Sequence, residues 1–132
     1  MTEIDTDIAH LINDRFKGRI EAYTVDTLGN HTDGVLVEMR QTGGSVDIDI
    51  NTETGGADIT VKMPFLGIRG TDRAQQIARE LYHELKLILD TTINGTYYGR
   101  ITADTPVHRV AGGEVPAPWS AWRFGLEIER EL

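Results

Sequence analysis

Oxygen-bearing side chains alternate with apolar residues between positions 47 and 53, and this row is the best candidate for metal chemistry in the chain. Its members are Asp47, Asp49, Asn51 and Glu53. Their spacing is that of the first ligands of a calcium-binding loop, which also needs a glycine at its sixth position and a glutamate at its twelfth. The chain has Thr52 and Asp58 at those two positions. We therefore interpret the row as the solvated face of a strand and predict no metal.

The histidines match no metal-ligand or protease spacing. They are His10, His31, His83 and His108. Remote histidines can converge only through the fold, so we interpret these as ordinary surface residues. The chain has no cysteine to supply a thiolate and no G-x-S-x-G motif to supply a nucleophilic serine. We therefore predict no catalytic residue.

Two further patterns are weaker candidates for chemistry. Gly67 to Thr71 precedes a predicted helix, where an anion can bind, but the segment lacks the lysine and the spacing of a phosphate loop. Glu127 and Glu129 share one face of a predicted strand and have the residue type for acid and base work. Strand alternation with Leu126 and Ile128 explains that pair sufficiently. Both patterns are interpreted as structural.

Length and composition favour one folded domain that covers residues 1–132. Hydrophobic residues make up 39% and charged residues 26% of the chain, which are globular values. The net charge of −8 opposes tight binding to nucleic acid. Met1 to Asp7 lack the basic and apolar regions of a signal peptide, and no stretch is long and apolar enough for a membrane span. We expect a cytosolic folding environment and no membrane contact.

Two segments have apolar residues at helical spacing. The first runs from Ile4 to Phe16 and ends near Gly18. The second is capped by Thr71 and carries one apolar stripe from Ala74 to Ile88, over about five turns. Asn94-Gly95 is expected to close this second helix.

The clearest strand alternation predicts a hairpin. Val46, Ile48 and Ile50 alternate with polar residues in a strand that begins after a break at Gly43-Gly44. Residues 53–56 are expected to turn this strand into a partner at residues 57–63. The pattern gives the hairpin one apolar face. Further strands are predicted at residues 20–25, 35–39, 97–103 and 121–131.

Together these elements indicate an α+β fold with a mostly antiparallel sheet and both helices packed on one face. Asp26–Gly34 and Asp104–Ser120 are left as long loops, which are uncommon in a compact domain unless they are functional. Trp122 fits the core register of the last strand, whereas Trp119 is left open as an interface anchor or as local packing. The residues expected to make subunit contacts are Leu28, His31, Val107, His108, Arg109 and Trp119.

The order and character of the elements extend over nearly the whole chain. The N-terminal helix and the hairpin at residues 47–63 come first, and Val61 to Pro64 leads through Arg69 to Asp72 into the helix at residues 74–89. The strand Trp122 to Ile128 closes the chain. In this order the chain resembles the tail terminator family of long-tailed bacteriophages, which are small tail-component or head-to-tail joining proteins also described as minor capsid proteins.

The resemblance implies a homo-oligomeric ring, of six subunits, that caps the completed tail tube, ends tube polymerisation and joins the tail to the head. The implied partners are further copies of the chain, the tail tube protein and the head completion protein, in a virion assembled in the host cytoplasm. DNA is expected to pass through the ring without specific binding, because an acidic protein repels the duplex. The family has no catalytic residues and no cofactor, so neither is expected here.

Two alternatives remain open. The same architecture is compatible with another virion role, as a tail tube subunit or a head completion protein. A different class of function is a small-ligand binding module or a hydrolase whose site is assembled from remote residues. The residues that such a site would use are His83, His108, Asp104 and Arg109.

Overall fold

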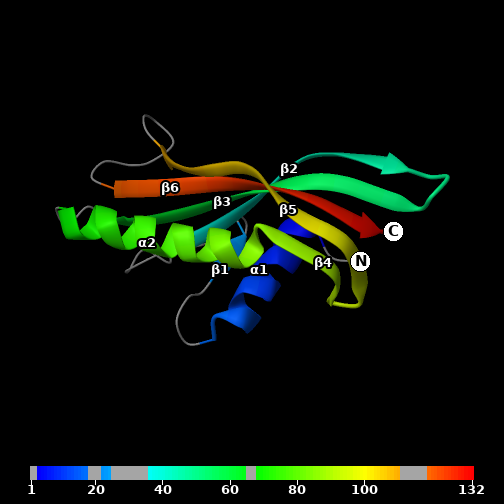
Figure 1. The fold of residues 1–132 in the computed structure, drawn as a ribbon, viewed down its shortest axis with the longest axis horizontal. Helices are drawn as coiled ribbons and strands as arrows, with labels where there is room; N and C mark the ends of the chain where they lie inside the picture. Colours follow the sequence, from blue (N-terminus) through cyan, green and yellow to red (C-terminus); the bar gives the residue numbers. More distant parts are fainter. Residues whose placement is uncertain (1–2, 18–21, 25–35, 65–67, 111–118) are drawn as a thin grey trace.

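The computed structural model of the chain describes residues 3–17, 22–24, 36–64, 68–110 and 119–132 (Figure 1). In chain order the elements are α1 (Ile4–Arg15), β1 (Ala22–Thr24), β2 (Leu36–Asp47), β3 (Thr52–Pro64), α2 (Ile68–Leu85), β4 (Leu87–Ile93), β5 (Thr96–Val110) and β6 (Trp119–Glu131). None of the helices in these ranges is long and apolar enough to cross a membrane.

The strands form one sheet in the order β1-β2-β3-β6-β5-β4. The short strand β1 is parallel to β2, and every other neighbouring pair is antiparallel. Figure 1 shows α1 and α2 on the same side of this sheet. The predicted α+β fold, with a mostly antiparallel sheet and two helices on one face, is therefore confirmed.

Strand alternation places the core between the sheet and the helices. Ile59 of β3 is the cross-strand partner of Phe124 of β6, and both side chains belong to one buried cluster. The ring of Tyr82 from α2 contacts Phe124 edge-on, with 5.6 Å between the ring centroids. Ile8 and Ile12 of α1 are fully buried in the same cluster. The apolar spacings of the two helices thus correctly predict which side chains reach the core.

The predicted turn of the central hairpin is wrong. Gly43-Gly44 does not break the chain, because β2 continues past these residues through a bulge in its pairing with β3. The positive φ values of the two glycines, 45° and 152°, are tolerated there because glycine has no Cβ. The chain reverses at residues 48–51 instead of 53–56, with Asn51 in the left-handed conformation at φ 55°.

The predicted end of the second helix is also wrong. The helix stops at Leu85, and residues 87–93 form β4, which the sequence pattern assigned in part to the helix. Asn94-Gly95 is the two-residue turn between β4 and β5, with φ values of 50° and 79°. Both residues adopt positive φ, which is the requirement of a tight turn between antiparallel strands.

The predicted loop at Asp104–Ser120 is shorter than expected. Its first part, to Val110, belongs to β5, and its last two residues belong to β6. The pairing of β5 with β6 shifts between Thr105 and His108, and this irregularity accommodates Pro106, which has no amide proton for the sheet. The remainder, residues 111–118, lies outside the described residues, as does the predicted loop at Asp26–Gly34.

Candidate assembly surface

The hairpin of β2 and β3 ends in an exposed apolar tip, which we define as residues 45–52. Val46, Ile48 and Ile50 have 55%, 85% and 67% of their surface exposed. The alternation that predicted one apolar hairpin face is present, but these side chains are in solvent rather than in the core. Figure 1 shows the β2–β3 hairpin extending past the helices at one end of the molecule. The tip is therefore a projecting apolar surface.

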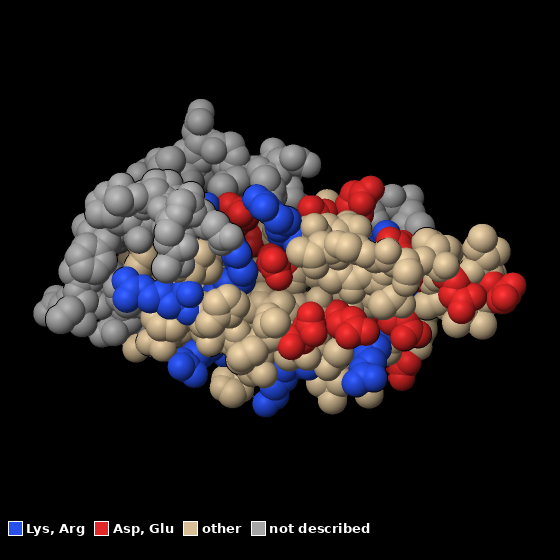
Figure 2. Space-filling model, turned by 90° about the horizontal axis from the view of Figure 1, so that it is seen from above, with Lys and Arg blue, Asp and Glu red and all other residues tan. Residues whose placement is uncertain are grey.

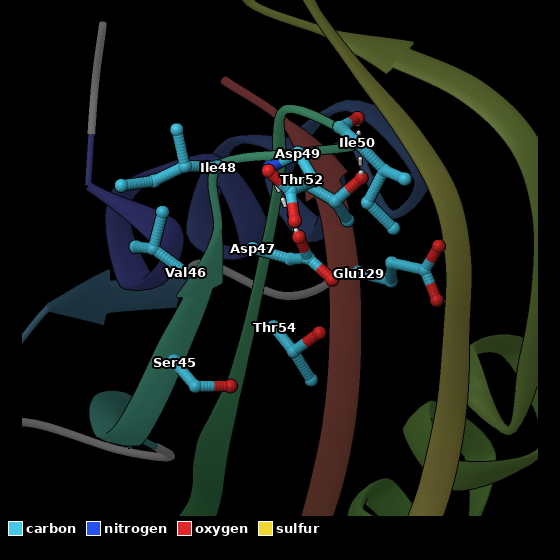
Figure 3. Close-up of a pocket in the computed structure, with 9 residues that line it drawn as sticks. All are labelled: Ser45, Val46, Asp47, Ile48, Asp49, Ile50, Thr52, Thr54 and Glu129. Carbon is cyan, nitrogen blue, oxygen red and sulfur yellow. Dashed lines mark hydrogen bonds between the residues drawn. The ribbon is translucent and has the colours of Figure 1, made fainter.

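Hydrogen bonds hold the tip in one shape. The amide of Asp49 donates to the Asp47 carboxylate at 3.1 Å, and the hydroxyl of Thr52 donates to the carbonyl of Ile50 at 3.1 Å (Figure 3). The tip is also fastened to the end of β6, because Asn51 and Leu132 exchange hydrogen bonds of 3.0 and 3.2 Å. Apolar side chains on such a preorganised turn lose little conformational entropy when they bind.

The row of acids considered for calcium is divided by this turn. Asp47 accepts a turn hydrogen bond, whereas Glu53 lies past the turn and pairs with Arg130. The prediction of a single solvated strand face is therefore wrong for this row. In the ranges that the structure describes, no group of three or more His, Asp or Glu side chains is arranged to hold a metal ion.

An open groove of about 630 Å³ runs along the hairpin beside the tip. Figure 3 shows its lining side chains, which come from the tip, from the adjoining part of β3 and from β6. They are Ser45, Val46, Asp47, Ile48, Asp49, Ile50, Thr52, Thr54 and Glu129. The groove thus combines apolar side chains with carboxylates and hydroxyls but holds no base beside a nucleophile, so its chemistry suits recognition better than catalysis.

Charge is unevenly distributed over the face of the sheet opposite the helices. In Figure 2 the acidic side chains gather toward the end that carries the hairpin, and most basic side chains lie toward the other end. The strand register explains the difference: Glu129 and Glu131 of β6 pair with the tip end of β3, whereas Arg123 and Lys62 lie near its far end. The molecule therefore has an acidic end and a more basic end on one face.

A second exposed apolar group lies on the edge strand β4, and we call it the β4 patch: Lys86, Leu87, Leu89 and Arg100. The two leucines are each 57% exposed. The register places Leu89 directly opposite Arg100 of β5, and Lys86 precedes Leu87 in the chain. Among the described strands β4 pairs only with β5, so its outer edge has no strand neighbour. The β4 patch is thus apolar at a sheet edge without a described strand neighbour, and its Arg100 is the cross-strand partner of Glu129 on β6.

A buried polar network fastens α1 to β3, β5 and β6. Asp7 of α1 is fully buried; it accepts hydrogen bonds from the hydroxyl of Tyr98 and, at 2.9 Å, from the amide of Asn94. The guanidinium of Arg130 lies 3.4 Å from Asp7 and donates to Tyr98 at 3.1 Å and to Glu53 at 3.0 Å. Burial, and then the hydrogen bond to Asp7, raise the pKa of Tyr98 well above its ordinary value. The network is closed and fully engaged, so we interpret it as structural.

The structure describes only part of the predicted contact set. Val107 is half-buried and packs against the core, whereas His108 and Arg109 are exposed on β5. The ring of His108 is hydrogen-bonded to the carbonyl of Pro106 at 2.9 Å. Trp119 begins β6, opposite Pro64. Leu28 and His31 lie outside the described residues.

The residues of the alternative ligand or hydrolase site come from different parts of the fold. His83 is exposed in the last turn of α2, on the side of the sheet that the helices cover. His108 is the cross-strand partner of Arg123. The guanidinium of Arg123 donates a hydrogen bond to the hydroxyl of Thr60 on the face opposite the helices. Asp104 lines a shallow groove with Gly55, Gly56 and Glu127 rather than with either histidine. This arrangement gives no support to the alternative.

Sequence reasoning missed the two surfaces that the structure makes most prominent. The alternation predicts the isoleucines of the tip on one apolar hairpin face, and Leu87 and Leu89 fall within the predicted second helix, outside its apolar stripe. The available signal was the presence of acids on both sides of Ile48, because a strongly polar neighbourhood is unusual for a buried hairpin strand. No family model matches the chain, and no curated protein resembles it at a significant level.

Proposed function

We propose that the protein is a non-catalytic assembly protein of the tail terminator type. In this role identical subunits form a ring, of six members in that family, which caps the completed tail tube, ends its polymerisation and joins the tail to the head. The resemblance in element order suggests this role. The single observation that supports it best is the projecting apolar tip, because Ile48 and Ile50 are exposed on a turn that hydrogen bonds hold in shape.

The exposed apolar tip has the character of a surface that contacts another protein. Isolated apolar side chains on a surface are ordinary, but three at one rigid turn form a patch that favours a protein contact. Burial of each such side chain in an interface contributes on the order of 1–2 kcal/mol. Together with flanking carboxylates that select orientation, this is sufficient for a specific contact between subunits.

A ring of identical subunits needs two different surfaces on each subunit. Heterologous contacts close into a ring when each subunit joins one patch to a different patch on its neighbour. This chain exposes the acidic, apolar tip on one hairpin and the apolar β4 patch on another. Its net charge of −8 also suits a channel through which DNA moves without adhering.

The experiment that tests the function combines size measurement with tube binding. Light scattering after gel filtration and negative-stain imaging should reveal rings, either free at high concentration or on the ends of tail tubes made from the tail tube protein. Tubes grown with the protein present should be shorter and capped, and capped tubes should bind the head completion protein. Continuous filaments made by this chain alone would identify a tube subunit instead. Failure to cap tubes, together with a monomer at every concentration, would refute the proposal.

A further inference from the structure

We infer that Asn94 is a site of spontaneous deamidation, and that its product breaks the hydrogen bond between the β4–β5 turn and Asp7 of α1. The reactants are the side-chain amide of Asn94, the backbone amide of Gly95 and water, so the reaction needs no enzyme. The inference is independent of the proposed function, because every step takes place within one chain. It assigns to the protein a covalent modification that loosens the attachment of α1.

The residue that follows each asparagine singles out Asn94. The chain has asparagines at positions 13, 30, 51 and 94, and only Asn94 is followed by glycine. In deamidation the backbone nitrogen of the next residue attacks the carbon of the side-chain amide. A Cβ on that next residue obstructs the attack, and glycine has none. Asn94-Gly95 is therefore the pair in this sequence with the least steric resistance to the reaction.

The fold leaves this pair accessible. Asn94 and Gly95 form the two-residue turn between β4 and β5 (Figure 1), and both residues are exposed. Beyond the chain neighbours, no heavy atom lies within 4 Å of the place that a Cβ on Gly95 would occupy, so a ring has room to form and water reaches it. Among the described residues nothing accepts a hydrogen bond from the Gly95 amide. The attacking nitrogen is therefore not held by the sheet.

A hydrogen bond to α1 holds the side chain of Asn94 in the folded protein. Its Nδ2 donates to Oδ1 of Asp7 at 2.9 Å. Asp7 is itself fully buried and bonded to Tyr98 and Arg130. The bond keeps the amide of Asn94 directed toward α1, so the attack on its carbon takes place when this bond opens. Deamidation of the folded protein should therefore be slower than that of the unfolded chain.

The reaction exchanges one carbon–nitrogen bond for another before water completes it. Base removes the proton of the Gly95 amide, and the nitrogen forms a bond to Cγ of Asn94. The bond from Cγ to Nδ2 breaks, and Nδ2 takes up a proton and leaves as ammonia. Water then opens the resulting succinimide: cleavage between the ring nitrogen and Cγ gives aspartate, and cleavage at the backbone carbonyl carbon gives isoaspartate. A neutral amide becomes a carboxylate, and nothing is oxidised or reduced.

Either product loses the hydrogen bond to Asp7. An ionised carboxylate has no proton to donate, and it repels the carboxylate of Asp7. Isoaspartate also adds a methylene group to the backbone of the turn, whose length sets the pairing of Ile93 with Thr96. The modification therefore weakens the contact of α1 with the β4–β5 turn, and isoaspartate also disturbs the turn itself.

Peptide mapping of aged protein tests the site. The folded protein is kept in mildly alkaline buffer, the more acidic species that forms is separated by ion exchange, and its peptides are sequenced by mass spectrometry. We expect the modification at Asn94, with isoaspartate among the products. Asn94→Gln keeps an amide but must close a larger ring, so it should lose this species. The matched control Asn51→Gln, at another exposed residue of positive φ, should form it as the wild type does.

Direct introduction of the aspartate product tests the consequence. The melting temperature of Asn94→Asp should be lower than that of the wild type by roughly 5 °C, because a hydrogen bond to a charged partner is lost. Asn51→Asp makes the same charge change and loses an exposed bond to the carbonyl of Leu132, so its shift should be much smaller. The isolated isoaspartate form should melt below Asn94→Asp, because its turn is also lengthened.

Two results would overturn the inference. The first is an absence of modification at Asn94 in the folded protein, over a time in which the chain unfolded in guanidinium chloride is converted at that residue. The second is a protein modified at Asn94 that melts as the unmodified protein does. Neither measurement depends on rings or tail tubes, so either result would leave the proposed function standing.

Discussion

Removal of one hydroxyl group from the buried network tests how the hairpin and α1 are held together. The Tyr98→Phe variant keeps the aromatic ring at this position. It loses the hydrogen bond that the Tyr98 hydroxyl donates to Asp7 and the one that it accepts from Arg130 at 3.1 Å. Both lost bonds involve a charged partner, and such bonds are worth about 1.5–3 kcal/mol each. The remaining contacts, Asn94 to Asp7 at 2.9 Å and Arg130 to Asp7 at 3.4 Å, retain part of the network.

The net cost for Tyr98→Phe is therefore about 2–3 kcal/mol of unfolding free energy, because the surviving partners offset part of the loss. For a domain of this length the melting temperature should fall by roughly 5–10 °C. The matched control is Tyr97→Phe, which removes an analogous hydrogen bond to Asp90 at the exposed surface and should leave the melting temperature unchanged within error. Thermal unfolding followed by circular dichroism measures both. Equal melting temperatures for the two variants would refute the reasoning.

Three further outcomes follow from the geometry. The folded protein holds the pKa of Tyr98 above its unfolded value. The contribution of Tyr98 to stability is therefore fully present below about pH 10 and is lost as the pH rises further. Urea unfolding above that pH should show the difference in unfolding free energy between the wild type and Tyr98→Phe narrowing by about 1.4 kcal/mol per pH unit. Gly56→Ala places a Cβ 2.5 Å from the Thr42 hydroxyl and 3.2 Å from a backbone carbonyl, so it should cost about 1–3 kcal/mol in urea unfolding, whereas Gly99→Ala, whose nearest contact is 3.8 Å, should cost far less. Ile48→Ser with Ile50→Ser should leave the melting temperature unchanged, because both side chains are in solvent, and should reduce binding of a hydrophobic dye.

Periodic patterns predicted the parts of the fold in which the chain keeps one structure over many residues. The apolar positions of α1 and the alternation of β6 around Phe124 are both confirmed, because a long amphipathic segment has only one way to bury its apolar side. From Ala74 to Leu85, α2 follows the same rule, although the helix begins at Ile68, before the predicted cap Thr71. Leu85 and Ile88 are both buried, so a helical stripe continues smoothly into β4 and conceals the boundary at residue 86.

Two glycine-containing segments of the chain lie within strands, although their composition predicts turns. Gly43-Gly44 and residues 53–56 have the composition of turns, yet they lie within paired strands. A Cβ at Gly55 would come within 2.8 Å of the Cδ1 atom of Ile4, and one at Gly56 would come within 2.5 Å of the Thr42 hydroxyl. Close approach of α1 to the sheet is a tertiary requirement, and it leaves no local signal that separates it from a turn.

The buried network and the two exposed apolar surfaces depend wholly on the tertiary structure. Asp7 and Arg130 are separated by most of the chain, and their pairing requires α1 to pack against the sheet. The exposure of Ile48 and of Leu87 likewise depends on where the hairpins end. Neither fact can be read from residue types, since an isoleucine between two acids fits a half-buried strand as well as an exposed turn.

By itself, the sequence predicted the α+β fold and which apolar residues share a face within each element. The tertiary structure decided where the chain reverses, and therefore which of those faces are buried. The physical reason is that alternation fixes the relation between neighbouring side chains, whereas the position of a turn is set by which strands pair. For residues 46–50 that pairing moves an apolar row from the core to the most exposed end of the molecule.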